Sequence, residues 1–126
     1  MDMPGLQIII SSGPEASPKA ALGFATAAAA LATGMPVHVF LVMDGTRWAF
    51  QSEGCEPEIF GFPAIAELMD TIQSAGGQIE ICSNCVGGSC DHESPRAASE
   101  PMRPGVVPAG LATVAIRTQH MQTLTF

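Results

Sequence analysis

Basic residues are scarce in this sequence. Five lysines and arginines stand against twelve aspartates and glutamates, which gives a formal net charge of −7 over 126 residues. A surface of that sign repels phosphate backbones and anionic lipids, so nucleic-acid and membrane partners are not expected. Only 13% of the residues are charged and 47% are hydrophobic, which argues against a disordered chain. The length and composition indicate a single globular domain over residues 1–126.

The chain also lacks a long apolar run and an export signal. The opening Met1-Asp2-Met3-Pro4 has no basic region of the kind that precedes the apolar part of a signal peptide. The alanine-rich stretch 20–32 is too short and too weakly hydrophobic to span a bilayer. We therefore expect a cytoplasmic protein. In that compartment a cluster of thiols is more often catalytic or metal-binding than disulfide-bonded.

Strand and helix patterns alternate along the chain. Five short apolar or β-branched segments predict strands, at residues 6–11, 37–43, 78–82, 106–108 and 122–126. One helix is predicted to begin with Ser17 as its N-cap and Pro18 at its first position. A second is predicted over Leu111 to Met121. A third begins near Pro63 and buries one stripe of side chains, Ile65, Leu68, Met69 and Ile72. The alternation predicts an α/β fold with three layers, α/β/α, around a five-stranded parallel sheet.

Two groups of residues are candidates for a ligand site or an interface. Ser11-Ser12, Asp44 and Cys82 all follow or end predicted strands, at the carboxyl edge where sheets of this kind bind ligands. Asp44 precedes a glycine, which is ordinary turn chemistry, so we assign function to Cys82 first. Four aromatic residues gather around one loop and either form an exposed interface patch or pack against the sheet edge: Trp48, Phe50, Phe60 and Phe62.

Three thiols lie within nine residues, at Cys82, Cys85 and Cys90. Cys82 ends a predicted strand, and the residues after it begin a helical turn whose backbone N–H groups and dipole favour the thiolate. Gly87-Gly88 leaves little bulk nearby, so the cysteine of a partner could approach. The pattern predicts a nucleophilic, partly exposed thiolate at Cys82.

A C-x-x-C pair has three common uses. A thioredoxin-like redox couple is disfavoured, because the tryptophan that normally precedes that motif is absent. A zinc-binding interaction or regulatory module stays open, since Cys90 and His92 complete a set of four ligand types with Cys82 and Cys85, although the spacing is not a standard zinc pattern. The third use is sulfur relay, in which one thiolate holds an extra sulfur atom. A purely structural oligomer with inert cysteines is a further alternative.

The features taken together resemble the DsrE/DsrF-like family of sulfur-relay proteins, which includes YchN-like and TusD-like proteins. The likeness covers essentially the whole chain and is carried by the segment Leu6 to Ala32, Phe40-Leu41-Val42-Met43-Asp44-Gly45, Ile81-Cys82-Ser83-Asn84-Cys85, Gly110-Leu111-Ala112-Thr113 and Thr123-Leu124-Thr125-Phe126. The resemblance implies a five-stranded parallel α/β/α domain, assembly into trimers or hexamers, and an active cysteine that maps onto Cys82. Some members carry the second cysteine, here Cys85. Many relatives have Arg-Gly after the motif where this chain has Ser89-Cys90, which makes Cys90 a possible accessory residue.

The sequence thus predicts a sulfur carrier or sulfurtransferase subunit that holds sulfane sulfur as a persulfide on Cys82. Each step is an attack by a thiolate on sulfur, so no cofactor and no metal is expected. The expected partners are a sulfur-donor and a sulfur-acceptor protein, with Cys85 as the second catalytic candidate and Cys90 as an accessory one. Cys55, in a separate acidic loop, is expected to be incidental, and His38 is expected to be a packed strand residue.

Overall fold

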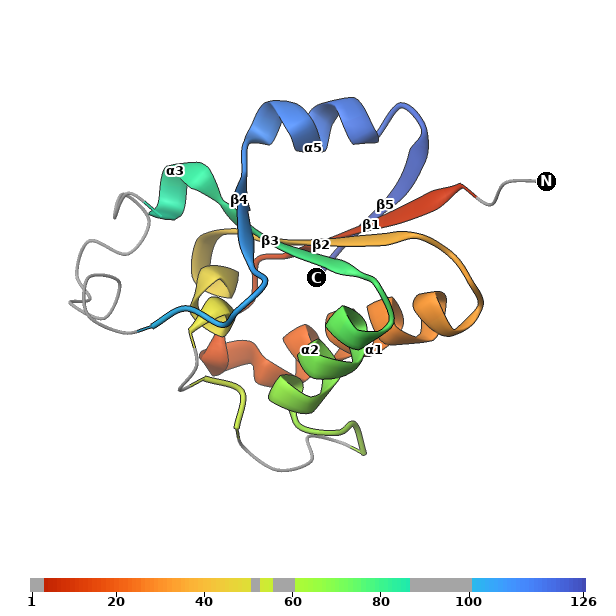
Figure 1. Cartoon of the computed structure of the whole chain (residues 1–126). Helices are drawn as coiled ribbons and strands as arrows, with labels where there is room; N and C mark the ends of the chain where they lie inside the picture. The colour runs from red at the N-terminus through yellow and green to blue at the C-terminus, as the bar shows by residue number, and fades with distance from the viewer. Residues whose placement is uncertain (1–3, 51–52, 56–60, 87–100) are drawn as a thin grey trace.

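The computed structural model describes residues 4–50, 53–55, 61–86 and 101–126 (Figure 1). At its centre is a five-stranded sheet in the order β4-β3-β2-β1-β5, and every neighbouring pair of strands is parallel. The strands are β1 (Gly5–Ile10), β2 (Val37–Leu41), β3 (Gln78–Cys82), β4 (Val107–Ala109) and β5 (Met121–Thr125). The predicted parallel sheet is confirmed, and its strand bounds differ from the expected ones by two residues at most.

Helices cover both faces of the sheet, so the predicted α/β/α layering is also confirmed. Figure 1 shows α1 (Ser17–Ala32) and α2 (Ile65–Ser74) together on one face and α5 (Leu111–Arg117) on the other. Shorter segments follow the first three strands: the 3-10 helices η1 (Pro14–Ala16) and η2 (Met43–Ala49), and α3 (Ser83–Val86). No helix in the described part of the chain is long and apolar enough to cross a membrane.

The large core lies between the sheet and the α1–α2 layer. Side chains of β1, β2 and β3 alternate between the two faces, and the apolar ones on this face are fully or nearly fully buried. The predicted stripe of α2 is confirmed, since all four of its residues are buried in this core: Ile65, Leu68, Met69 and Ile72. Alanines at positions 20, 21 and 27 of α1 are completely buried, so this helix lies close to the strands.

Two expected helix bounds are wrong. Ser17 already has helical backbone angles, φ −58° and ψ −34°, and is the first residue of α1, whereas Ala16 is the N-cap with φ −130° and ψ 44°. The last predicted helix ends at Arg117 and not at Met121. The backbone N–H of Thr118 closes the helix on the carbonyl groups of its last turn, and Met121 pairs with Gly5 as the first residue of β5.

Of the two alternatives for the aromatic residues, the exposed patch is wrong for Trp48 and Phe50. Trp48 and Phe50 are only 3% and 6% exposed. The Trp48 indole packs edge-to-face on Phe24 of α1, with ring centroids 6.4 Å apart, and its Nε1 donates a hydrogen bond of 2.8 Å to the carbonyl oxygen of Ser12. Phe62 is partly buried against the same core, and Phe60 lies outside the described residues. Trp48, Phe50 and Phe62 therefore pack inside the domain rather than forming an exposed patch.

The opposite face of the sheet has a much thinner apolar layer. Its buried members are Phe40, Cys82 and Val114, with Ile9, Val42 and Ala109 packed around them. Val114 is the one buried residue of α5. This small cluster surrounds the principal candidate for the functional site.

Candidate functional site

Cys82 is the last residue of β3, a strand with a neighbour on each side. Its backbone pairs with Ala109 of β4, and its side chain lies on the face of the sheet that α5 covers, in the cluster with Phe40 and Val114. The thiol is free, but Cys82 is only 2% exposed. The sequence suggested a partly open thiolate, and the structure instead buries this residue beneath α5.

The surroundings of Cys82 at the carboxyl edge of the sheet have the arrangement expected of a ligand site. After β2 the chain enters η2, whose Trp48 packs against α1, whereas after β3 it enters α3 on the same side of the sheet as α5 (Figure 1). The later part of the connection after β3 returns to the α1–α2 face, where Arg103 pairs with Asp70 of α2. The carboxyl ends of parallel strands are the usual binding place in open α/β sheets. Ser83 and Asn84 are exposed there.

Met43 stands at the same edge and has an unusual backbone. Among the described residues it is the one non-glycine with a positive φ, at +55°, and its side chain is 61% exposed. Left-handed backbone at a residue with a side chain is strained, and such strain is found preferentially near functional sites. A large apolar side chain held out of the core beside the end of β3 strengthens the assignment of the site to this edge.

The other edge residues expected from the sequence serve the local structure. Ser11 Oγ donates a hydrogen bond of 3.0 Å to the carbonyl oxygen of Phe126. The pKa of Glu15 is held below its ordinary value of 4.5, chiefly by a backbone hydrogen bond and then by hydrogen bonding with Asp44, together with the charge of Arg47. Asp44 therefore takes part in joining η1 to η2.

The remaining thiols and the possible zinc ligands are only partly described. Cys85 is in α3, three residues after Cys82, and Cys90 and His92 lie outside the described residues. The set of four zinc ligands and the accessory role of Cys90 thus stay predictions. Within the described ranges there is no group of three or more metal-ligating side chains. Cys55 is exposed and belongs to a different segment.

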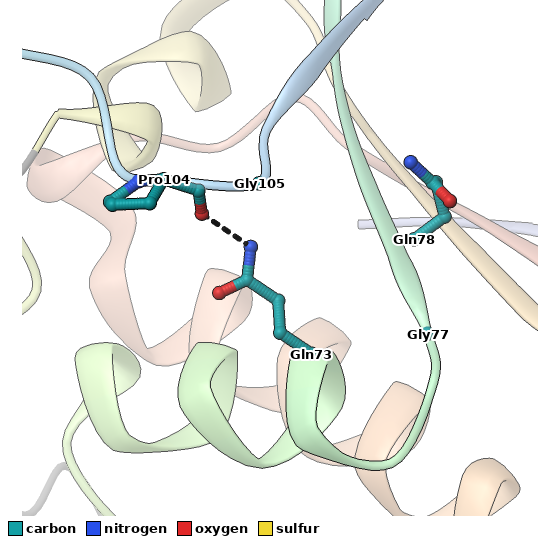
Figure 2. Close-up of a pocket in the computed structure, with 5 residues that line it drawn as sticks. All are labelled: Gln73, Gly77, Gln78, Pro104 and Gly105. Atoms are coloured by element: carbon teal, nitrogen blue, oxygen red, sulfur yellow. Dashed lines mark hydrogen bonds between the residues drawn. The ribbon is translucent and has the colours of Figure 1, made fainter.

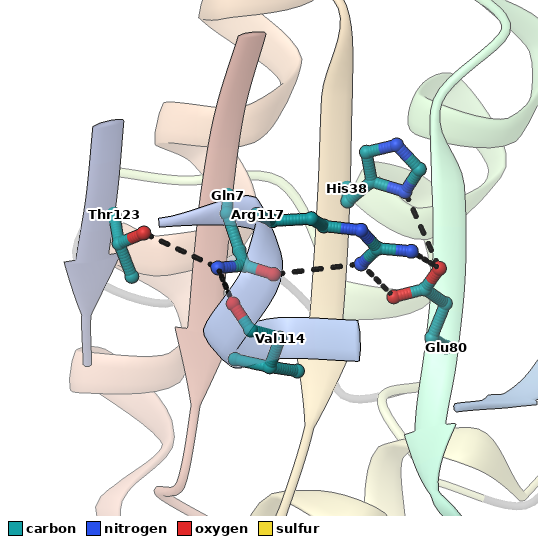
Figure 3. A network of polar contacts seen from close by, with 6 residues as sticks. All are labelled: Gln7, His38, Glu80, Val114, Arg117 and Thr123. Atoms are coloured by element: carbon teal, nitrogen blue, oxygen red, sulfur yellow. Dashed lines mark hydrogen bonds and ion pairs between the residues drawn. The ribbon is translucent and has the colours of Figure 1, made fainter. Parts of the chain in front are cut away.

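A network of polar side chains beneath α5 was not expected from the sequence (Figure 3). Its centre is Glu80 of β3, which is 3% exposed. Both carboxylate oxygens of Glu80 accept hydrogen bonds of 2.6 Å from the guanidinium group of Arg117, and His38 Nδ1 lies 3.3 Å from the same carboxylate. This bidentate pair joins the last residue of α5 to the middle of the sheet.

Gln7 extends the network to the first strand. It is completely buried, and its Nε2 donates hydrogen bonds of 3.2 Å to the carbonyl oxygen of Val114 and to Thr123 Oγ1. Its Oε1 accepts a bond of 3.4 Å from Arg117. The sequence signal for this network was a polar residue on the same face of three apolar strands: Gln7 pairs with His38, and Glu80 lies two residues beyond Gln78, the partner of His38.

The environment of Glu80 keeps its carboxylate charged. Burial raises its pKa, but hydrogen bonds from His38 and Arg117 and the charges of the same two residues outweigh burial and hold the pKa below the ordinary 4.5. The pair is therefore an ionic contact at neutral pH.

A shallow pocket of about 360 Å³ lies at the other end of β3 and has no part in this site. Figure 2 shows its lining residues, Gln73, Gly77, Gln78, Pro104 and Gly105. Gln73 Nε2 already donates a hydrogen bond of 3.0 Å to the carbonyl oxygen of Pro104, and no charged or nucleophilic group lines the pocket.

Comparison with known proteins agrees with this architecture. The model of the DsrE/DsrF-like family matches residues 6–126. The chain belongs to the DsrE/DsrF-like family. The family resemblance noted in the sequence is thereby confirmed. No curated protein matches the chain.

A solved structure of the same fold is that of the ychN protein from E. coli. The ychN sequence is 19% identical to this one, and the match covers 98% of this chain and 100% of the ychN chain. The two structures superpose with a TM-score of 0.78. At that identity the match establishes the shared fold. Within the DsrE/DsrF-like domain described here, Cys82 ends an interior strand at the carboxyl edge and lies beneath a short helix held by an ionic pair.

Proposed function

We propose that this DsrE/DsrF-like protein is a sulfur carrier, in which Cys82 accepts sulfane sulfur, holds it as a persulfide and passes it to a thiol of an acceptor protein. Sulfur relay is the general role of the family to which the chain belongs. The observation that carries the assignment to Cys82 is its place at the carboxyl end of β3, an interior strand of the parallel sheet.

The proposed chemistry balances without an added oxidant or reductant. The Cys82 thiolate attacks the outer sulfur of a donor persulfide, the donor's S–S bond breaks, and its electron pair leaves on the donor thiolate. The product is Cys82–S–SH. Delivery repeats the step, with the acceptor thiolate attacking the outer sulfur and Cys82 leaving as a thiolate.

Cys85 is proposed to act after loading. It follows Cys82 by three residues, at the third position of α3. Attack of the Cys85 thiolate on the inner sulfur of the persulfide would form a Cys82–Cys85 disulfide and release hydrosulfide. Cys85 is therefore expected to control how long the persulfide lasts rather than whether it forms.

Mass spectrometry of the intact protein after incubation with polysulfide tests the assignment. Wild type should gain about 32 Da, one sulfur atom, and Cys82→Ser should not. Cys85→Ser should load sulfur but hold it for a different time. Cys55→Ser is the matched control, because Cys55 is an exposed cysteine in another segment, and it should behave as wild type. Loading of Cys82→Ser together with failure of Cys85→Ser or Cys90→Ser would move the nucleophile to another cysteine.

The proposed partners are donor and acceptor proteins in the cytoplasm, with the protein itself a homotrimer or homohexamer. The burial of Trp48 and Phe50 removes them as support for such an assembly. Support now comes from other large apolar side chains that are exposed in the single chain: Leu22, Met43, Val107, Leu111, Ile116 and Leu124.

A further inference from the structure

We propose that α5 is a cover over Cys82, latched to the sheet by the Arg117–Glu80 pair, and that sulfur exchange at Cys82 requires this latch to open. The proposal rests on the proposed function of Cys82. The burial of the Cys82 thiol by α5 can be tested without any sulfur donor.

The start of α5 and the side chain of its last residue both contact the end of β3 that carries Cys82. Cys82 pairs with Ala109, the last residue of β4, and α5 begins two residues later after its N-cap Gly110. A Cβ added to Gly110 would lie 3.8 Å from Ser83 Oγ, so the start of α5 is close to the residue that follows Cys82. The last residue of α5, Arg117, donates two hydrogen bonds to Glu80, which lies two residues before Cys82 on the same face of β3. The helix therefore starts close to the thiol and crosses the sheet toward β1, and the side chain of its last residue reaches back to β3 (Figure 3).

Apolar contacts hold this helix only weakly. Val114 is its one buried residue, whereas α1 has five buried residues. Leu111 and Ile116 are 54% and 58% exposed. Elements with few buried apolar contacts open locally at a lower free energy than the core. The attachment of α5 to the sheet thus depends heavily on the polar network, with Gln7 holding the Val114 carbonyl and Glu80 holding Arg117.

The chemistry of sulfur exchange makes opening necessary. A thiolate has to reach a sulfur atom carried on another protein, and a residue that is 2% exposed offers no such approach. Cys82 is enclosed with Val114 of the cover and Phe40 of β2. Movement of α5 would expose the thiol and leave β3 in place, because β3 is held by β2 and by the core on the other face.

Alkylation with iodoacetamide, followed by peptide mass mapping, measures the opening directly. The exposed Cys55 serves as an internal reference in the same molecule. In wild type, Cys82 should react much more slowly than Cys55. In Arg117→Met and in Glu80→Gln the Cys82 rate should rise at least about tenfold, while the Cys55 rate stays constant, because loss of a charged hydrogen-bonded pair favours the open state by that factor or more.

A matched core variant separates local opening from general instability. Ile72→Val removes one methylene group from the core on the opposite face, where Ile72 is completely buried in α2. It should lower global stability and leave the ratio of Cys82 to Cys55 rates at the wild-type value. In the latch variants the Cys82 rate should also vary little with low concentrations of urea, since local opening exposes little surface.

Three results would overturn the proposal that α5 covers Cys82. They are equal alkylation of Cys82 and Cys55 in wild type, an unchanged Cys82 rate in both latch variants, and an equal acceleration by Ile72→Val. If the latch variants behave as expected but Cys82→Ser still loads sulfur, the cover stands and the proposed function of Cys82 fails.

Discussion

Replacing Glu80 with glutamine keeps the shape of the side chain and removes its charge. In the wild type this carboxylate is buried, with a side chain 4% exposed, and forms two hydrogen bonds of 2.6 Å to Arg117. The variant would leave the Arg117 guanidinium, 14% exposed, without a counter-charge. The substitution therefore isolates the ionic part of the network that holds α5.

The expected loss of stability is large for a single substitution. Removing one partner of a buried ion pair costs about 3–5 kcal/mol. Arg117 keeps some access to solvent and a hydrogen bond to Gln7, and glutamine still offers one acceptor, so we expect about 2–3 kcal/mol. A domain of this size is stable by about 5–15 kcal/mol in total, so the change is readily measured.

Urea unfolding at pH 7, followed by circular dichroism, gives the free energy of unfolding of each variant. Glu67→Gln is the matched control, because Glu67 is exposed on α2, and it should change stability by less than about 0.5 kcal/mol. A loss below about 0.5 kcal/mol for Glu80→Gln as well would refute the view that this pair anchors α5.

Acid should weaken the same contact. The pKa of Glu80 is depressed in the folded protein, in an environment formed by His38 of β2, Arg117 of α5 and Gln7 of β1. A group of this kind contributes stability that is complete above its ordinary value of 4.5 and is lost as the pH falls through the lower folded value. The difference in unfolding free energy between wild type and Glu80→Gln should therefore shrink below pH 4.5. A difference that stays constant on acidification would contradict this reasoning.

Three further outcomes are expected. Gly45→Ala should cost several kcal/mol in urea unfolding, because an added Cβ would collide with the backbone carbonyl of Ile10, and wild-type stability would contradict the close approach of η2 to β1. Purified protein should contain well under one zinc ion per chain by elemental analysis, whereas stoichiometric zinc that is lost in Cys85→Ser would favour the zinc-binding alternative. Light scattering at micromolar concentration should give the mass of a trimer or hexamer, and a monomer mass would count against the proposed assembly.

The strands and α2 could be predicted because their signals are local. Strands such as β1 and β3 are short apolar segments bounded by glycine, serine or proline, and α2 shows a stripe of period 3.6. The end of α5 was misplaced because Met121 satisfies a helical pattern as well as a strand pattern. Pairing with Gly5, distant in the sequence, decided between the two. The place of Trp48 stayed open between two alternatives for the same reason, since its partners Phe24 and Ser12 belong to earlier segments of the chain.

The sequence alone determined that the chain folds as a parallel α/β/α domain and that Cys82 ends a strand at the carboxyl edge, because periodicity and strand order in the chain suffice for both. Only the tertiary structure decided whether that thiol is accessible. The burial of Cys82 depends on α5, whose Val114 packs with Cys82 on the sparse face of the sheet. That helix is held by contacts between residues 37 and 107 positions apart, Arg117 with Glu80 and Gln7 with Val114. Contacts of this range leave no periodic pattern along the chain, so they become visible only when the strands are assembled.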